Sequence, residues 1–176
     1  MSSGSNPQFT RRLMLDLERL QKQNPPGVSA GPLKMGQLDK WEARIEGPVG
    51  TPFEQGVFNL SMEFPSEYPF KPPKFQVKFT TVMFHPNVYA DGKICLDILA
   101  NEWVATYDVT SVLLSIQALL TDPNPNSPAN VDAAKLFRQN RKEYDKRVQD
   151  LVQKNTVGQE KKDVKKWSGF FKRLFH

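Results

Sequence analysis

The order of hydrophobic periodicities along the chain constrains its fold more than any other feature. Apolar residues recur at helical spacing near the N-terminus, alternate with polar residues in the next part of the chain, and recur at helical spacing again after Asp108. Because helices and strands are grouped rather than alternating, this order predicts an α+β fold. Neither period is sustained from Thr80 to about Tyr107, and irregular segments of that length in compact domains are commonly functional.

The first helix is expected to begin at Pro7, because Asn6 suits the N-cap and proline suits the first helical position. The run Asn24-Pro25-Pro26-Gly27 ends its pattern. One apolar stripe on this helix is expected to face the core, with charged residues off the stripe. The stripe consists of Phe9, Leu13, Leu17 and Leu20, and the charged residues off it are Arg11, Arg12, Asp16 and Arg19.

Three strands are expected after this helix, each marked by apolar residues that alternate with polar ones. Short links rich in glycine and proline join them, so the strands should form an antiparallel meander. The alternating apolar residues are Trp41, Ala43 and Ile45 in the first strand, Phe58, Leu60, Met62 and Phe64 in the second, and Phe75, Val77 and Phe79 in the third.

Helices are expected to return after the irregular segment. Asp108 and Asn130 are suited to cap two of them, and the run Asp122-Pro123-Asn124-Pro125 ends the first. A further helical stretch carries the apolar residues Tyr144, Val148 and Leu151.

Charge and cysteine content narrow the classes of function. The net charge is +5, but residues 156–176 contribute +4 of it, so the basicity belongs to a tail rather than to the nearly neutral body. A single cysteine excludes an internal disulfide and a multi-cysteine metal cage, and it suits a reducing compartment. No signal peptide or membrane span is recognisable, and we expect a cytoplasmic and nuclear protein.

The one cysteine lies in the irregular segment, within HPNVYADGKICLDI. A nucleophilic cysteine usually has a histidine base, but the only histidine outside the tail is His85, ten residues before Cys95 and directly before a proline. No cysteine, histidine and asparagine arrangement of the papain type can be assembled, which argues against a cysteine protease. The residues alone therefore leave two interpretations of Cys95, a small buried side chain or a working thiol.

A series of motifs resembles the ubiquitin-conjugating enzymes, in the order and spacing of that family. The motifs extend over nearly all of residues 6–152, which we expect to form the catalytic domain, followed by a tail at residues 153–176. The resemblance implies the UBC fold, with an N-terminal helix, an antiparallel meander sheet, a long active-site loop and C-terminal helices. Within the family, the motifs are most similar to the DNA-repair and histone-modifying branch. The motifs are EGPVGTPFEQGVF, EYPFKPPK, MFHPNVYADGKICLDIL, Trp103, TYDVTSVLLSIQALL and DPNPNSPAN.

The resemblance implies that Cys95 accepts ubiquitin from an activating enzyme as a thioester and passes it to a substrate lysine, usually with a ligase. A thioester already reacts with amines, so the chain has to orient the lysine, help remove its proton and stabilise the tetrahedral oxyanion. No metal or bound cofactor is implied, because the activating enzyme consumes the ATP. Two other interpretations stay open, a non-catalytic scaffold of the same fold and an adaptor whose tail binds a membrane or nucleic acid.

The resemblance also implies roles for residues around Cys95. Asn87 occupies the position of the family's HPN asparagine and either stabilises the oxyanion or holds the active-site loop in shape. Many members have an acidic residue after the PNP turn that lowers the pKa of the incoming lysine, but this chain has Ser127 there. That chemistry would then depend on Asp97, which is equally suited to cap a loop, or on a carboxylate of a partner. His85 is implied to be a hydrogen-bonding core residue and not a base.

Partner-binding residues follow from the same resemblance. Arg11 and Arg12 are implied to meet an acidic surface of the activating enzyme, although charge on an exposed helix usually serves only solvation. Phe70 is implied to anchor a RING-type ligase, since a large ring in a proline-rich loop is hard to bury locally. Two departures from the family pattern indicate that the usual ligases bind differently. They are Val104-Ala105 in place of the common serine-proline and Leu15 at a usually basic position.

The tail sequence VGQEKKDVKKWSGFFKRLFH is basic, and it is amphipathic when written as a helix. Three kinds of partner stay open for it: its own domain or a second copy, an anionic membrane surface, and nucleic acid or a groove on a partner protein. Short isolated helices are marginal in water, so we expect this segment to order only on contact. Membrane binding would add peripheral membrane association to the expected location.

Overall fold

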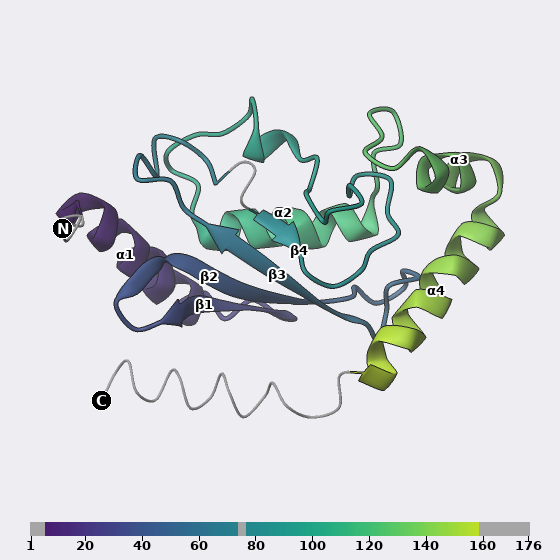
Figure 1. Ribbon diagram of the computed structural model, residues 1–176, viewed down its shortest axis with the longest axis horizontal. Helices are drawn as coiled ribbons and strands as arrows, with labels where there is room; N and C mark the ends of the chain where they lie inside the picture. The colour runs from purple at the N-terminus through teal and green to yellow at the C-terminus, as the bar shows by residue number, and fades with distance from the viewer. Residues whose placement is uncertain (1–5, 74–76, 159–176) are drawn as a thin grey trace.

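The computed structural model describes residues 6–73 and 77–158, and the described part contains four α-helices, a short 3-10 helix and four strands (Figure 1). The α-helices are α1 (Pro7–Gln23), α2 (Val109–Thr121), α3 (Val131–Gln139) and α4 (Arg141–Gly158). The strands are β1 (Val28–Lys34), β2 (Gln37–Glu46), β3 (Val57–Glu63) and β4 (Val77–Phe79), and the 3-10 helix η1 spans Asp97–Leu99. The predicted α+β fold is confirmed.

The four strands form one antiparallel sheet in the order β1-β2-β3-β4. This is the predicted meander with one strand more than the sequence pattern indicates. The additional strand is β1, whose small residues, with Gly31 and Pro32 among them, give no strand pattern. Its pairing with β2 aligns Val28 with Ile45 and becomes irregular between Pro32 and Lys34. Because β1 is an edge strand, a proline without an N–H is tolerated there.

The core lies between the sheet and the helices α1 and α2. The predicted cap of α1 is present, with Asn6 Oδ1 accepting a hydrogen bond from the Gln8 N–H at 3.0 Å. Its predicted stripe is buried at Leu13, Leu17 and Leu20. Alternate strand residues complete the core, namely Trp41, Ala43, Ile45, Phe58, Leu60, Met62, Val77 and Phe79. Phe75 of the third expected strand lies outside the described residues.

The helices α3 and α4 lie at the end of the sheet opposite α1 (Figure 1). α3 begins at its predicted cap, where Asn130 Oδ1 accepts from the Ala133 N–H at 3.0 Å. α4 continues to Gly158, past the expected end of the catalytic domain at residue 152. The remainder of the tail, residues 159–176, lies outside the described residues, so the predictions for it stay predictions. Within the described residues, no helix is long and apolar enough to cross a membrane.

Candidate active site

A tight turn holds the segment that carries Cys95. An isolated bridge pairs Val88 with Ile94, directly before the cysteine. The chain reverses at Gly92, where φ is 88° and an added Cβ would lie 2.1 Å from Phe79 O. Only glycine fits a position that combines a left-handed backbone with so close an approach. The turn at Ala90-Asp91-Gly92 therefore sets the direction from which the chain approaches Cys95.

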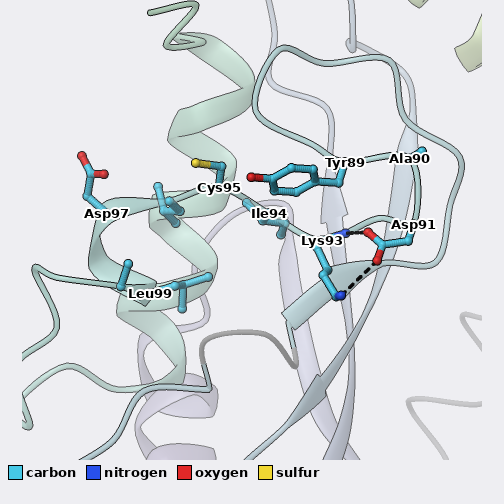
Figure 2. Close-up of a pocket in the computed structure, with 10 residues that line it drawn as sticks. Tyr89, Ala90, Asp91, Lys93, Ile94, Cys95, Asp97 and Leu99 are labelled. Carbon is cyan, nitrogen blue, oxygen red and sulfur yellow. Dashed lines mark hydrogen bonds and ion pairs between the residues drawn. The ribbon is translucent and has the colours of Figure 1, made fainter. Parts of the chain in front are cut away.

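Cys95 is half-buried and lines a pocket of about 570 Å³. Figure 2 shows Tyr89 on one side of Cys95 and Asp97 on the other. This position favours the interpretation of Cys95 as a working thiol over that of a small buried side chain. Among the described residues, no group of three or more histidine, cysteine, aspartate or glutamate side chains is arranged to hold a metal ion.

His85 is fully buried, and both nitrogens of its ring are hydrogen-bonded. Nδ1 accepts from the Asn87 N–H at 2.9 Å, so Nε2 carries the proton and donates to Leu119 O at 2.9 Å. Burial lowers the pKa of His85 to about 4, although the hydrogen bond to Leu119 acts in the opposite direction. A buried neutral imidazole fits the predicted core role and is not available as a base for Cys95.

The lowered pKa of His85 predicts a loss of stability in mild acid. Below pH 6.5 the unfolded chain takes up a proton on this residue while the folded chain does not until about pH 4, so the free energy of unfolding falls by roughly 2–3 kcal/mol over that window. The contribution is fully present above pH 6.5. Urea unfolding of the native chain and of His85→Asn from pH 7.5 to 4.5 should show the steeper pH dependence in the native chain. Parallel curves would contradict the prediction.

Asn87 connects the Cys95 segment to the loop between α2 and α3. Its Nδ2 donates to Asn124 O at 2.6 Å, and its Oδ1 accepts from the Asn124 N–H at 2.8 Å. Its backbone carbonyl accepts from the Cys95 N–H at 2.9 Å. The side chain is 2% exposed and bonded at both ends of its amide. The resemblance implies either that Asn87 stabilises the oxyanion or that it holds the active-site loop in shape, and this geometry matches the second role.

The two other predicted catalytic residues lie at the surface. Asp97 is the exposed first residue of η1 and lines the same pocket as Cys95. Its backbone carbonyl accepts from the Ala100 and Glu102 N–H groups, but its carboxylate has no hydrogen-bond or ion-pair partner among the residues that the structure describes, so the side chain caps no loop there. Ser127 is exposed in the loop that Asn87 holds. The structure therefore brings Cys95 and Asp97 together in one pocket, which Ser127 does not line. The bonds of Asn87 link Cys95 to the loop that carries Ser127.

Comparison with known proteins decides the family. The family model described as ubiquitin-conjugating enzyme matches residues 12–152. The chain belongs to the ubiquitin-conjugating enzyme family. It is 59% identical over 145 residues to the protein named ubiquitin-conjugating enzyme E2 1 of Caenorhabditis elegans, covering 82% of this chain and 74% of that protein. It is 57% identical over 145 residues to ubiquitin-conjugating enzyme E2 2 of Saccharomyces cerevisiae, covering 82% of this chain and 83% of that protein.

Membership in the ubiquitin-conjugating enzyme family confirms the resemblance seen in the sequence motifs. The helices and the antiparallel sheet of the described residues are the UBC fold that the motifs imply. The narrower placement in the DNA-repair and histone-modifying branch stays a prediction.

In this member of the family, Arg12 makes hydrogen bonds within its own chain. Its terminal nitrogens donate to Ala105 O at 2.8 Å and to Tyr107 O at 2.6 Å, which ties α1 to the loop before α2. The Arg12 side chain is only 16% exposed, so the geometry gives it a structural role. Its contact with the activating enzyme stays a prediction. Arg11 is exposed, and its contact with that enzyme stays a prediction.

Asp16 is a residue whose role the sequence pattern missed. It was expected off the apolar stripe of α1, and the structure corrects this, because Asp16 is fully buried. Its carboxylate accepts from Arg12 Nε at 2.7 Å and from the hydroxyl of Tyr68. Burial raises the pKa of the Tyr68 phenol, so the hydroxyl keeps its proton and donates it to this bond. The spacing contained a signal, since Asp16 lies three residues after Leu13 and four before Leu20 on one helix face.

Phe70 is exposed, as the proline-rich loop around it predicts. Its ring is 78% exposed. The neighbouring Trp103 donates from Nε1 to Pro69 O at 2.8 Å, which joins the Phe70 loop to the loop that carries Val104 and Ala105. Val104 is 48% exposed. Two apolar side chains on two linked loops thus form an accessible surface.

Proposed function

We propose that this enzyme accepts the C-terminal glycine of ubiquitin on Cys95 Sγ and transfers it to a substrate lysine. The observation that carries the proposal is a half-buried thiol at a pocket, in a chain whose His85 is buried and bonded at both ring nitrogens and so cannot serve as a base for that thiol. A site of this kind suits the carrying of an activated acyl group better than the cleavage of a peptide bond. The names of the relatives support ubiquitin as the group carried.

Two exchanges at the ubiquitin carbonyl make up the proposed reaction. In the first, Cys95 Sγ attacks the thioester on the activating enzyme, so that a C–S bond to Cys95 forms, the C–S bond to the activating enzyme breaks, and the thiol proton passes to the sulfur released. In the second, the lysine Nζ attacks the new thioester, a C–N bond forms and the C–S bond breaks. The proton lost by the amine restores the thiol of Cys95. ATP is consumed by the activating enzyme.

We assign Asp97 to the removal of the lysine proton. Of the two carboxylates that line the pocket, Asp91 already accepts from the Lys93 N–H at 3.1 Å and pairs with Lys93 Nζ at 3.2 Å. Asp97 has no such partner among the described residues, and it lies two residues after Cys95. Ser127 bears no charge, so the loop between α2 and α3 supplies no carboxylate from that position.

The proposal is tested by incubating the enzyme with ubiquitin, a ubiquitin-activating enzyme and ATP, followed by electrophoresis with and without reducing agent. A band heavier by one ubiquitin is expected that depends on ATP and disappears on reduction. The same reaction with ubiquitin-like proteins and their activating enzymes is the control for the group carried. A folded chain that forms no reducible adduct with ubiquitin would refute the proposal and favour the non-catalytic scaffold.

Ubiquitin, an activating enzyme and a ligase are the partners that the family implies, and the exposed ring of Phe70 supports a RING-type ligase. Phe70→Ala is expected to lower the affinity for a RING domain that stimulates transfer by tenfold or more. The reason is that a few large aromatic residues dominate the binding energy of such interfaces. Titration of the domain into each variant, with the initial rate of transfer as readout, measures this. The matched control is Val131→Ala, an exposed apolar residue at the start of α3. Equal effects of the two substitutions would exclude a ligase surface at Phe70.

We also propose a cytoplasmic and nuclear location with peripheral membrane association through the tail. The single cysteine suits a reducing compartment, and the tail combines a charge of +4 over residues 156–176 with several aromatic residues. Co-flotation with vesicles containing phosphatidylserine, but not with neutral vesicles, is expected for the full chain. Recovery with neither kind of vesicle would contradict the membrane partner, and equal recovery with both would contradict a role for the basic charge.

A further inference from the structure

A continuous path of hydrogen bonds runs from α3 to the backbone of Cys95. It passes through the loop of residues 123–128, which we call the PNP loop, and then through Asn87. Each step is a direct contact between adjacent groups. The steps are Arg138 Nη2 to Asn126 Oδ1 (3.3 Å), the Asn126 N–H to Asn124 Oδ1 (3.1 Å), the Asn124 N–H to Asn87 Oδ1 (2.8 Å), and the Cys95 N–H to Asn87 O (2.9 Å).

The PNP loop is anchored at its ends by the active-site segment. Asn87 holds Asn124 at one end, and Pro86 O accepts from the N–H groups of Ala129 (2.8 Å) and Asn130 (3.0 Å) just past the other end. Between these anchors the chain has few donors of its own, because proline at positions 123, 125 and 128 lacks an N–H. The middle of the loop therefore depends on contacts from elsewhere.

Arg138 supplies that contact. Its Nη2 donates to Pro125 O as well as to Asn126 Oδ1. Of the described residues outside the PNP loop, Arg138 alone hydrogen-bonds to residues 125–128. Ser127, the residue expected beside the incoming lysine, directly follows the two residues that Arg138 holds.

The helix that carries Arg138 is itself firmly held. α3 is capped by Asn130 and buries Ala133 and Ala134. The residue before Arg138, Phe137, packs edge to face on Tyr144, with the ring centroids 5.2 Å apart. A side chain on such a helix gives the loop a fixed reference point, although Arg138 itself is exposed.

We propose that Arg138 is a positioning residue for the transfer step, which holds the middle of the PNP loop in place so that an acceptor lysine reaches the thioester on Cys95 in a productive orientation. This inference rests on the proposed function. Arg138 does not touch the reacting atoms and acts through the loop. Misplacement by about 1 Å slows attack by an amine that the loop orients, whereas the loop is not proposed to orient the water that hydrolyses the thioester.

The experiment uses the purified thioester of the full-length enzyme, freed of activating enzyme and ATP. Its loss is followed in buffer alone, which measures hydrolysis, and with free lysine at several concentrations, which measures transfer. For Arg138→Ala we expect normal charging, normal hydrolysis, and a second-order rate constant of transfer to lysine that is three- to tenfold lower. Arg138→Lys keeps one donor that can reach Pro125 O and is expected to recover at least half of the native rate.

The matched control is Lys135→Ala. Lys135 is an exposed basic residue of the same helix, α3, and its side chain has no hydrogen bond or ion pair among the described residues. Lys135→Ala should transfer ubiquitin at the native rate. Transfer by Arg138→Ala at the rate of Lys135→Ala, an equal fall in hydrolysis and transfer, or no recovery in Arg138→Lys would each overturn the positioning role. Failure of the native chain to form any thioester would instead refute the proposed function.

Discussion

Cys95→Ala is expected to abolish ubiquitin conjugation completely. Cys95 is the only cysteine in the chain, so no second thiol can accept the acyl group. The side chain is half-buried at the surface of the pocket, and its loss opens no cavity in the main core. The expected result is therefore a folded enzyme without a reducible adduct, with a urea midpoint close to that of the native chain.

The variant Cys95→Ser also tests whether Cys95 is the acceptor, through an adduct that is expected to form but not to be reducible. In Cys95→Ser, an oxygen replaces the sulfur, and an ester is less reactive toward amines than a thioester. A ubiquitin adduct is expected to form slowly, to survive reducing agent, and to resist transfer to lysine. Electrophoresis with and without reducing agent distinguishes the native, alanine and serine chains in one experiment. A reducible adduct in either variant would show that Cys95 is not the acceptor.

Asn87→Ala is expected to have the second largest effect, a fall of about 10²-fold in the rate of transfer to lysine. The substitution removes both hydrogen bonds to Asn124, so the PNP loop loses its anchor next to the pocket. The backbone bond from Asn87 O to Cys95 does not depend on the side chain and should persist. Charging by the activating enzyme should consequently fall much less than transfer.

Comparison of hydrolysis with transfer separates the two roles considered for Asn87. Both reactions pass through a tetrahedral oxyanion, so an oxyanion donor accelerates both, and its removal slows both. A residue that holds the loop affects the placement of lysine and leaves hydrolysis nearly unchanged. Because the amide donor of Asn87 is bonded to Asn124 O at 2.6 Å, we expect the second pattern. Equal losses in the two reactions would assign Asn87 to the oxyanion.

Much of the fold could be predicted from local patterns. The caps at Asn6 and Asn130 and the apolar stripe of α1 depend on neighbours within one helical turn, where sequence spacing translates directly into geometry. The strands β2 and β3 alternate because one face of each is buried. Cys95 and the motifs around it likewise identified the centre of the candidate site.

The edge strand β1 could not be predicted in this way. Its sequence contains Gly31 and Pro32 and carries no alternation that indicates a strand. Its strand conformation is stabilised by hydrogen bonds to β2, a segment that follows it and folds back on it. The free energy of that pairing depends on both segments, so the strand cannot be predicted from the sequence of either segment alone.

What the sequence by itself determined is the succession of helices and strands, the position of a lone thiol in an irregular segment, and membership in a family. Only the tertiary structure decided that His85 is neutral and closed to solvent, that Arg12 and Tyr68 compensate a buried Asp16, and that Asn87 and Arg138 hold the PNP loop. The physical reason is range. Periodicity and capping act between residues within a few positions of one another, whereas burial, pKa and loop anchoring depend on groups that the folded chain brings together from distant positions.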